Sequence, residues 1–82
     1  MVEANGARLL DGSHARADLL TPRELDVLSY LALGKAKKEV ANLLGISLKT
    51  VDHHASHIMD KLDIHDRVAL ARFAIREGLV KP

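Results

Sequence analysis

The chain has 82 residues, of which 48% are apolar and only 2% aromatic, and its formal net charge is +1. That length fits one small domain with an aliphatic core, and the scarcity of aromatic residues favours helices over strands. The sequence has no cysteine and no apolar run of the roughly 18 residues that cross a membrane, which argues against disulfides, thiolate metal sites and a membrane-spanning protein. We therefore expect a soluble, cytoplasmic, all-α protein without a membrane partner.

The first part of the chain differs from the rest. Residues 1–19 mix small, polar and charged types without a lasting period, and we interpret them as a flexible tail or linker. Within this segment, Ala7–Leu10 and Ala17–Leu20 are apolar enough to touch the folded part. The sequence thus predicts a single folded domain over residues 20–82.

The first helix is predicted over residues 22–33. Thr21 offers a capping hydroxyl, Pro22 occupies the first helical position, and Glu24 follows three residues after the cap. This is the pattern of a capping box. Gly34 provides the helix end.

Two further helices follow at close spacing. The second is predicted over residues 36–44 and ends at Gly45, and the third is predicted over residues 48–62 with Ser47 as its cap. Two helices joined by so short a turn containing glycine are typical of a helix-turn-helix.

The third predicted helix has two contrasting faces. One carries an apolar stripe at helical spacing, formed by Val51, Ala55, Ile58 and Leu62. The other carries short polar, charged and imidazole side chains, namely Lys49, Asp52, His53, Ser56, His57, Asp60 and Lys61. A helix anchored on one side and polar on the other suits a reader of DNA grooves.

A fourth helix is predicted over residues 67–77, with Asp66 as its cap and Gly78 at its end. It is apolar over more than one face, and we expect its core-facing side near Leu70, Ala71 and Ala74. The other side would remain exposed and form a surface for a partner, most simply a second copy of the chain. That surface comprises Ala69, Arg72, Phe73 and Arg76.

Several segments match one known family at its spacing. They are L-T-P-R-E-L-D-V-L at 20–28, G-K-A-K-K-E-V-A-N-L-L-G-I-S-L-K-T-V at 34–51 and A-I-R-E-G-L at 74–79, with His54, Ile58, Lys61 and Leu62 between them. Together they resemble the LuxR/FixJ-type helix-turn-helix effector domain. The resemblance covers most of the chain.

The resemblance implies a four-helix domain whose third helix enters the major groove, while the second crosses the DNA backbone and the fourth dimerises. Such domains are bacterial transcription regulators, usually the C-terminal output of a response regulator. The implied partners are double-stranded DNA, a second copy of the chain on DNA, and RNA polymerase as a further candidate. Whether the chain is a piece of a longer regulator or stands alone is left open.

The resemblance also assigns roles to residues. Phosphate contacts are expected at Lys37, Lys38, Ser47, Lys49, Thr50 and Lys61, and base contacts at Lys49, Asp52, His53, Ser56 and His57. Asp52 departs from the family, which often has lysine there. An aspartate accepts rather than donates, so Asp52 would accept from a cytosine amino group or form a salt bridge with Lys49.

The histidines allow two further interpretations. Protonated His53, His54 and His57 would be favoured beside DNA, so we expect DNA affinity to strengthen as the pH falls from about 7.5 to 6. As metal ligands, His53 and His57 lack a third partner, and no metal is expected. No catalytic motif is present, so we expect neither an enzyme nor a cofactor or small-molecule ligand.

Two alternative functions stay open. The chain would be a helical protein-interaction module without DNA binding, or a sigma-factor-like region that works only when bound to RNA polymerase. The first predicts that loss of Lys38 and Lys49 leaves its activity intact. The second predicts no autonomous choice of DNA site.

Overall fold

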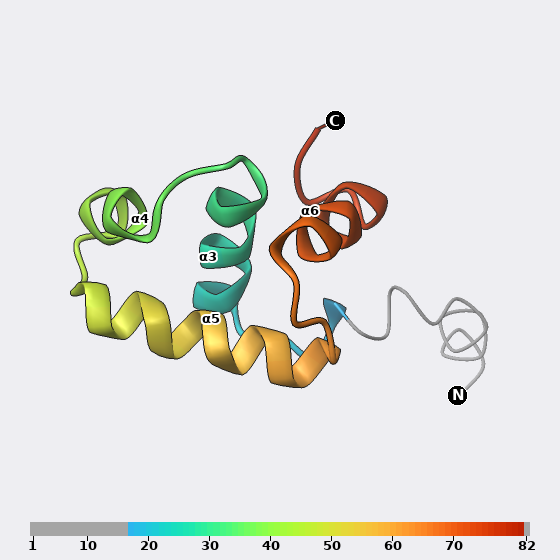
Figure 1. Cartoon of the computed structure of the whole chain (residues 1–82), viewed down its shortest axis with the longest axis horizontal. Helices are drawn as coiled ribbons and strands as arrows, with labels where there is room; N and C mark the ends of the chain where they lie inside the picture. The colour runs from blue at the N-terminus through green and yellow to red at the C-terminus, as the bar shows by residue number, and fades with distance from the viewer. Residues whose placement is uncertain (1–16, 82) are drawn as a thin grey trace.

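A computed structural model describes residues 17–81, and these form four α-helices without a strand (Figure 1). The helices are α3 (Pro22–Ala32), α4 (Lys37–Leu44), α5 (Leu48–Leu62) and α6 (Arg67–Arg76). The all-α, four-helix prediction is confirmed, and each predicted boundary agrees to within one residue. No helix within this range combines the length and the apolar character needed to span a bilayer.

The start of the described chain contacts the domain as expected. Leu20 is buried and Ala17 is partly buried against the core, whereas the predicted contact at 7–10 lies outside the described residues. The division into a tail at 1–19 and a domain at 20–82 stays a prediction.

Local hydrogen bonds explain where the helices begin. Thr21, Ser47 and Asp66 each accept a hydrogen bond from the backbone N–H three residues later, at 2.9 to 3.1 Å. Ala36 has no hydroxyl, but Glu39 accepts from its backbone N–H at 3.0 Å. Each side chain satisfies a backbone group that the first helical turn leaves unpaired.

All four helices end in the same type of turn. The residue after each last turn has a positive φ, and a backbone N–H one position further on returns to a carbonyl five residues back. Glycine occupies that position after α3, α4 and α6, where a side chain would be strained. After α5 the position is held by Asp63, with a φ of 54°.

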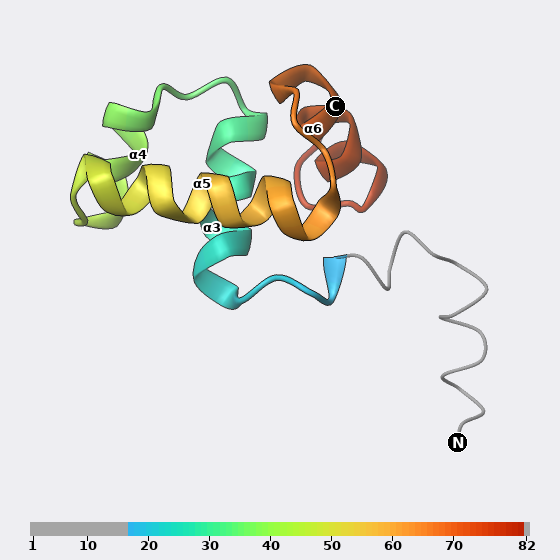
Figure 2. The ribbon, with the colours of Figure 1, turned by 60° about the horizontal axis from the view of Figure 1, so that its bottom comes forward.

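The arrangement is centred on α3, which contacts each of the other three helices, while α4 also contacts α5. Figure 2 shows α5 crossing in front of α3, with α4 near one end of α5 and α6 near the other. The tight turn at Gly45 connects α4 to α5, and this pair is the predicted helix-turn-helix.

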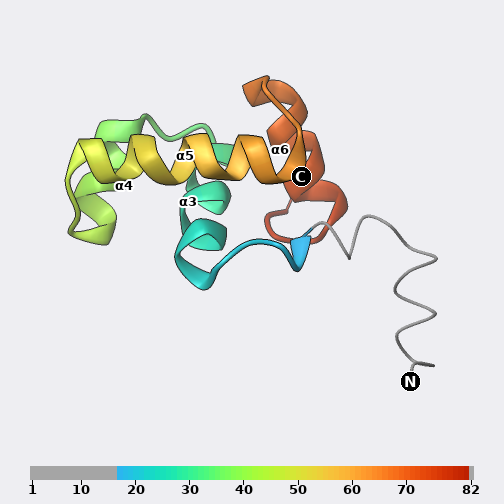
Figure 3. The same cartoon turned by 90° about the horizontal axis from the view of Figure 1, so that it is seen from below.

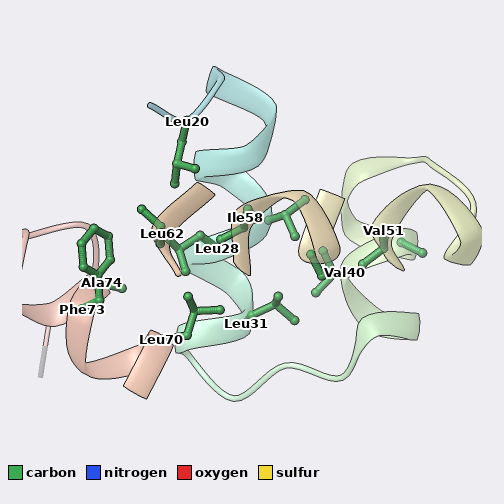
Figure 4. Packing of buried hydrophobic residues seen from close by; sticks show 13 residues of the cluster. Leu20, Leu28, Leu31, Val40, Val51, Ile58, Leu62, Leu70, Phe73 and Ala74 are labelled. Atoms are coloured by element: carbon green, nitrogen blue, oxygen red, sulfur yellow. The ribbon is translucent and has the colours of Figure 1, made fainter. Parts of the chain in front are cut away.

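The core is aliphatic apart from one aromatic ring (Figure 4). All four helices contribute to it, with Val40 and Val51 at one end and Phe73 and Ala74 at the other. Its remaining members are Leu20, Val27, Leu28, Leu31, Ala41, Ala55, Ile58, Leu62 and Leu70. The predicted stripe of α5 is therefore wholly buried.

The orientation predicted for α6 needs one correction. Phe73 was expected on the exposed side, but it is fully buried, together with Leu70 and Ala74. These three positions have the spacing i, i+3 and i+4 and form the face that packs against α3. Ala71 lies at the edge of that face, and the most exposed apolar side chain of α6 is Val68.

A polar contact also joins α6 to α3. The guanidinium of Arg67 donates to the carbonyl of Leu31 at 3.1 Å and to the carbonyl of Lys35. The carbonyl of Leu31 lies in the last turn of α3, where the helix dipole favours a positive charge, and Lys35 lies in the connection between α3 and α4.

Candidate nucleic-acid interface

The outward side of α5 is not covered by another helix. Figure 3 views the molecule from this side, and α5 lies in front of the other three helices. We call the exposed side chains there the outer face of α5: Lys49, Asp52, His53, Ser56, His57 and Asp60. The five base-contacting residues predicted from the sequence thus lie together on one exposed helix surface.

The N-terminal tip of α5 carries two hydroxyls. The Oγ of Ser47 accepts from the backbone N–H of Thr50 at 3.1 Å, and the two side-chain oxygens lie 2.9 Å apart. The expected capping role of Ser47 is therefore confirmed. Both residues are exposed at a helix N-terminus, where backbone N–H groups and the helix dipole favour an anion.

Asp52 forms an ion pair with α4. Its Oδ1 lies 2.9 Å from the Nζ of Lys37, and the two side chains are 54% and 47% exposed. The sequence offered Lys49 as a salt-bridge partner of Asp52, and the structure shows Lys37 instead. Because both groups are exposed to water, the ion pair contributes only about 0 to 1 kcal/mol to stability. The contact between α4 and α5 therefore depends mainly on apolar packing, to which the buried Val40 and Val51 contribute.

Two other basic residues of the region are placed differently. Lys38 is exposed in the first turn of α4, and Lys49 is exposed in the first turn of α5. Among residues 17–81, neither ammonium has a carboxylate within ion-pair distance. Their charges are therefore available to an incoming polyanion.

Lys61 lies at the other end of α5 and is already paired. Its Nζ lies 2.7 Å from Oε1 of Glu24, a carboxylate of α3 that is only 3% exposed as a residue. The same oxygen accepts from the backbone N–H of Thr21 at 2.9 Å. The ammonium of Lys61 thus neutralises a buried charge, and the phosphate contact expected of Lys61 stays a prediction.

The electrostatics of Glu24 combine opposing effects. Burial raises the pKa of this carboxyl, but the hydrogen bond from Lys61, the N–H of Thr21 and the positive charge of Lys61 together outweigh burial. The pKa of Glu24 therefore lies below the ordinary value of a glutamate. Glu24 is ionised at neutral pH and joins the start of α3 to the end of α5.

The two histidines of the outer face contact each other, and one of them, His57, approaches the carboxylate of Glu24. The rings of His53 and His57 lie 4.2 Å apart between centroids. Nδ1 of His57 lies 3.9 Å from Oε2 of Glu24. Within residues 17–81 no cluster of three histidine, cysteine, aspartate or glutamate side chains is arranged to hold a metal ion.

Sequence reasoning missed three features of this surface. It did not pair Lys37 with Asp52 or Lys61 with Glu24, since both pairs depend on how the helices pack. It also overlooked Leu48, which is exposed at the first position of α5. The signal for Leu48 was available, because position 48 lies off the apolar stripe of the helix.

Comparisons with known proteins agree with this geometry. The family model described as "Bacterial regulatory proteins, luxR family" matches residues 18–74. The chain is 47% identical over 60 residues to the uncharacterized response regulatory protein YgeK of Escherichia coli (strain K12). It is also 46% identical over 61 residues to the transcriptional regulatory protein LiaR of Bacillus subtilis (strain 168), and 39% identical over 75 residues to the transcriptional regulatory protein MctR of Rhizobium johnstonii.

These matches cover most of this chain but a minor part of each relative. They span 73%, 74% and 92% of the chain for YgeK, LiaR and MctR, and 41%, 29% and 33% of those proteins. The chain therefore corresponds to less than half the length of the relatives that it matches.

Proposed function

Because the chain belongs to the luxR family of bacterial regulatory proteins, we propose that it binds double-stranded DNA at specific sequences and thereby regulates transcription. In this proposal α5 lies in the major groove, which is wide enough for one helix and displays distinct base edges. The observation that carries the proposal is the outer face of α5. A helix held by a fully buried stripe leaves polar side chains uncovered on its other side, as a groove-reading helix requires.

The phosphate contacts are assigned from charge and exposure. Lys38 and Lys49 have no carboxylate partner within residues 17–81, so we assign both to the DNA backbone. Ser47 and Thr50 are assigned to a phosphate at the N-terminus of α5. Lys37 contributes less, because Asp52 already neutralises its charge, and Lys61 is left out because it pairs with Glu24.

The base contacts are assigned to the middle of the outer face. His53 and Ser56 lie within one helical turn of each other, and the ring of His57 is tilted by 53° against the ring of His53. Imidazole and hydroxyl groups donate or accept hydrogen bonds, so they suit base edges of either kind. Asp52 is the fourth member of this group, and its chemistry is the most restrictive.

We further propose that the protein binds DNA as a dimer through α6. Single domains with few phosphate contacts bind weakly, and two half-sites raise both affinity and specificity. The exposed side of α6 offers an apolar and basic surface consisting of Val68, Arg72, Ile75 and Arg76, with the half-buried Ala69 beside them. Phe73 is not part of it, because its ring fills the core.

The regulatory setting is proposed from the relatives. YgeK is named a response regulatory protein, and MctR and LiaR are named transcriptional regulatory proteins. By analogy this domain would serve as the DNA-binding output of a two-component system. Contact with RNA polymerase stays a prediction.

Selection of bound sequences from a pool of random duplexes tests the proposal. The purified protein should enrich one motif at low salt without any added partner. The affinity for that motif should fall as salt rises, and Lys38→Ala and Lys49→Ala should each reduce the slope of log affinity against log salt by about 1. Arg23→Ala serves as the control, since Arg23 is an exposed cation of α3 that already pairs with Asp26 at 3.8 Å.

The alternatives predict different results. A protein-interaction module would not shift duplex DNA even at low salt. A sigma-like region would bind DNA without enriching a motif until polymerase is added. Either outcome would overturn the proposal.

A further inference from the structure

The ion pair between Lys37 and Asp52 lies where the helix-turn-helix meets its proposed groove. Lys37 is the first residue of α4, and Asp52 lies in the second turn of α5. Nζ and Oδ1 are 2.9 Å apart, with about half of each side chain exposed. The pair adds little to stability in so exposed a position. Its main consequence is for the surface, since it fixes where a carboxylate lies on the outer face of α5.

A carboxylate on a DNA-reading surface is selective because it only accepts hydrogen bonds. In the major groove guanine offers two acceptors, and thymine offers one acceptor beside a methyl group. Cytosine instead presents an amino donor, which is the base edge that aspartate matches. Adenine also has an amino group, but its neighbouring N7 acceptor faces the second carboxylate oxygen. A carboxylate therefore disfavours guanine, thymine and adenine. Its discrimination against these three bases contributes more to specificity than its attraction to cytosine does.

Lys37 removes the main obstacle to this use of Asp52. An isolated carboxylate would be repelled by the phosphates on both sides of the groove. The ammonium of Lys37 compensates that charge and engages Oδ1, and no further hydrogen bond or ion pair holds Oδ2 within residues 17–81. The oxygen that remains can accept from a base while the paired oxygen keeps the side chain in place.

We infer that Asp52, held by Lys37, selects a cytosine at one base pair of each half-site. Asp52 is the specificity-determining residue, and Lys37 is a positioning residue that acts through it. This inference rests on the proposed binding of α5 in the major groove. Beyond that binding, cytosine is the base recognised by Asp52, and Lys37 on α4 has the role of holding the Asp52 carboxylate.

The test is selection from random duplexes by the intact protein and by three variants. The wild-type motif should contain a position at which cytosine is preferred by roughly tenfold. Asp52→Ala should remove the preference at that position alone, and Asp52→Asn should move it toward adenine, whose edge matches an amide. Lys37→Met should reduce the same preference several-fold without changing the other positions.

Matched controls separate these effects from loss of a surface charge. Asp26→Ala and Arg23→Met remove the two partners of an exposed ion pair on α3, and both should leave the whole motif unchanged. Thermal melting followed by circular dichroism should show that every variant folds.

Three outcomes overturn the inference. A motif that keeps every position in Asp52→Ala would show that Asp52 reads no base. A motif altered by Asp52→Ala but not by Lys37→Met would refute the role of Lys37. The absence of any motif with the wild-type protein would instead overturn the proposed function, and the inference with it.

Discussion

The ammonium of Lys61 lies 2.7 Å from the buried carboxylate of Glu24, and 37 positions of sequence separate the two residues. The contact joins the last turn of α5 to the first turn of α3, where Glu24 also completes the capping box with Thr21. The carboxylate of Glu24 thus both caps the start of α3 and binds the C-terminal end of α5, the proposed recognition helix. The pair thus adds a polar contact to the apolar packing between α3 and α5.

Substitutions of Lys61 and of Glu24 should lower the free energy of unfolding by different amounts. Lys61→Met leaves a buried carboxylate without its counter-charge and should cost about 2 to 3 kcal/mol. Glu24→Gln keeps an acceptor for Thr21 and leaves an ammonium that water can reach, so it should cost about 1 kcal/mol. Urea unfolding followed by circular dichroism measures both.

A control for this comparison is Arg23→Met, which breaks the exposed pair with Asp26. Its cost should stay within about 0.5 kcal/mol. Equal costs for Lys61→Met and Glu24→Gln, or the reverse order, would contradict the view that burial of Glu24 makes the pair asymmetric.

The same carboxylate should make stability depend on pH. Because the pKa of Glu24 is lower in the folded protein than in the unfolded chain, the unfolded chain takes up the proton first as the pH falls. The contribution of Glu24 is thus fully present above the ordinary glutamate pKa of about 4.3 and is lost as the pH drops through the folded value. The free energy of unfolding should therefore decline below about pH 5.

Urea titrations at a series of pH values test this expectation. Glu24→Gln has no proton to exchange at this position, so its decline should be shallower than that of the wild type. Parallel profiles for the two proteins would assign the acid sensitivity to other carboxylates.

Asp63 offers a site where the protein can be made more stable. This residue ends α5 with a φ of 54°, which strains a side chain, and its negative charge lies at the unfavourable end of the helix dipole. Asp63→Gly relieves both and should stabilise the protein by about 0.5 to 1 kcal/mol. Asp63→Asn removes only the charge and should gain less. A loss of stability in the glycine variant would contradict this reasoning, as measured by thermal or urea unfolding.

The helices could be predicted because their signals are local. The Thr21 to Glu24 capping box acts within one turn, and so does the glycine after α3. The apolar stripe of α5 likewise depends only on positions along one helix. Such patterns need no knowledge of how the helices pack, and their predicted boundaries agree with the structure to within one residue.

Features that depend on packing were beyond the sequence. α6 is apolar over more than one face, so its core-facing side was predicted only in part: Leu70 and Ala74 are buried as expected, but Phe73 was wrongly placed outside the core. The partners of Lys61 and Asp52 come from other helices, and their identity follows from the crossing of α5 with α3 and α4. The charged residues of α5 were therefore predicted correctly as exposed, but the residues with which Asp52 and Lys61 pair were not.

The corrected orientation of α6 leads to a contrast between two substitutions. Phe73→Ala would open a cavity in the core and should cost about 3 to 5 kcal/mol, which is much of the stability of a small domain. Val68 is 61% exposed, so Val68→Ser should change stability by less than about 0.5 kcal/mol. If α6 forms the proposed dimer, Val68→Ser should weaken self-association in sedimentation experiments with DNA. Unchanged self-association of the Val68→Ser variant would contradict a dimer interface on α6.

The paired rings of His53 and His57 should make DNA affinity depend on pH. Histidine gains a positive charge as the pH falls from about 7.5 to 6, and a charge on the outer face of α5 would be attracted by phosphates. The two histidines differ in their surroundings, because Nδ1 of His57 lies 3.9 Å from the carboxylate of Glu24, whose other oxygen pairs with Lys61. The charge of a protonated His57 would be partly compensated by that carboxylate, whereas among residues 17–81 no carboxylate lies within ion-pair distance of His53.

We therefore expect a several-fold gain in affinity over this pH range at constant ionic strength, with His53 contributing the larger part. Fluorescence anisotropy with the selected duplex measures it for the wild type, His53→Gln, His57→Gln and the double variant. His53→Gln should remove most of the gain and His57→Gln less of it, while the double variant should give a flat profile. A wild-type affinity that does not change over the range would rule out any role of the imidazoles as charged contacts. A larger effect of His57→Gln would show that Glu24 does not compensate its charge.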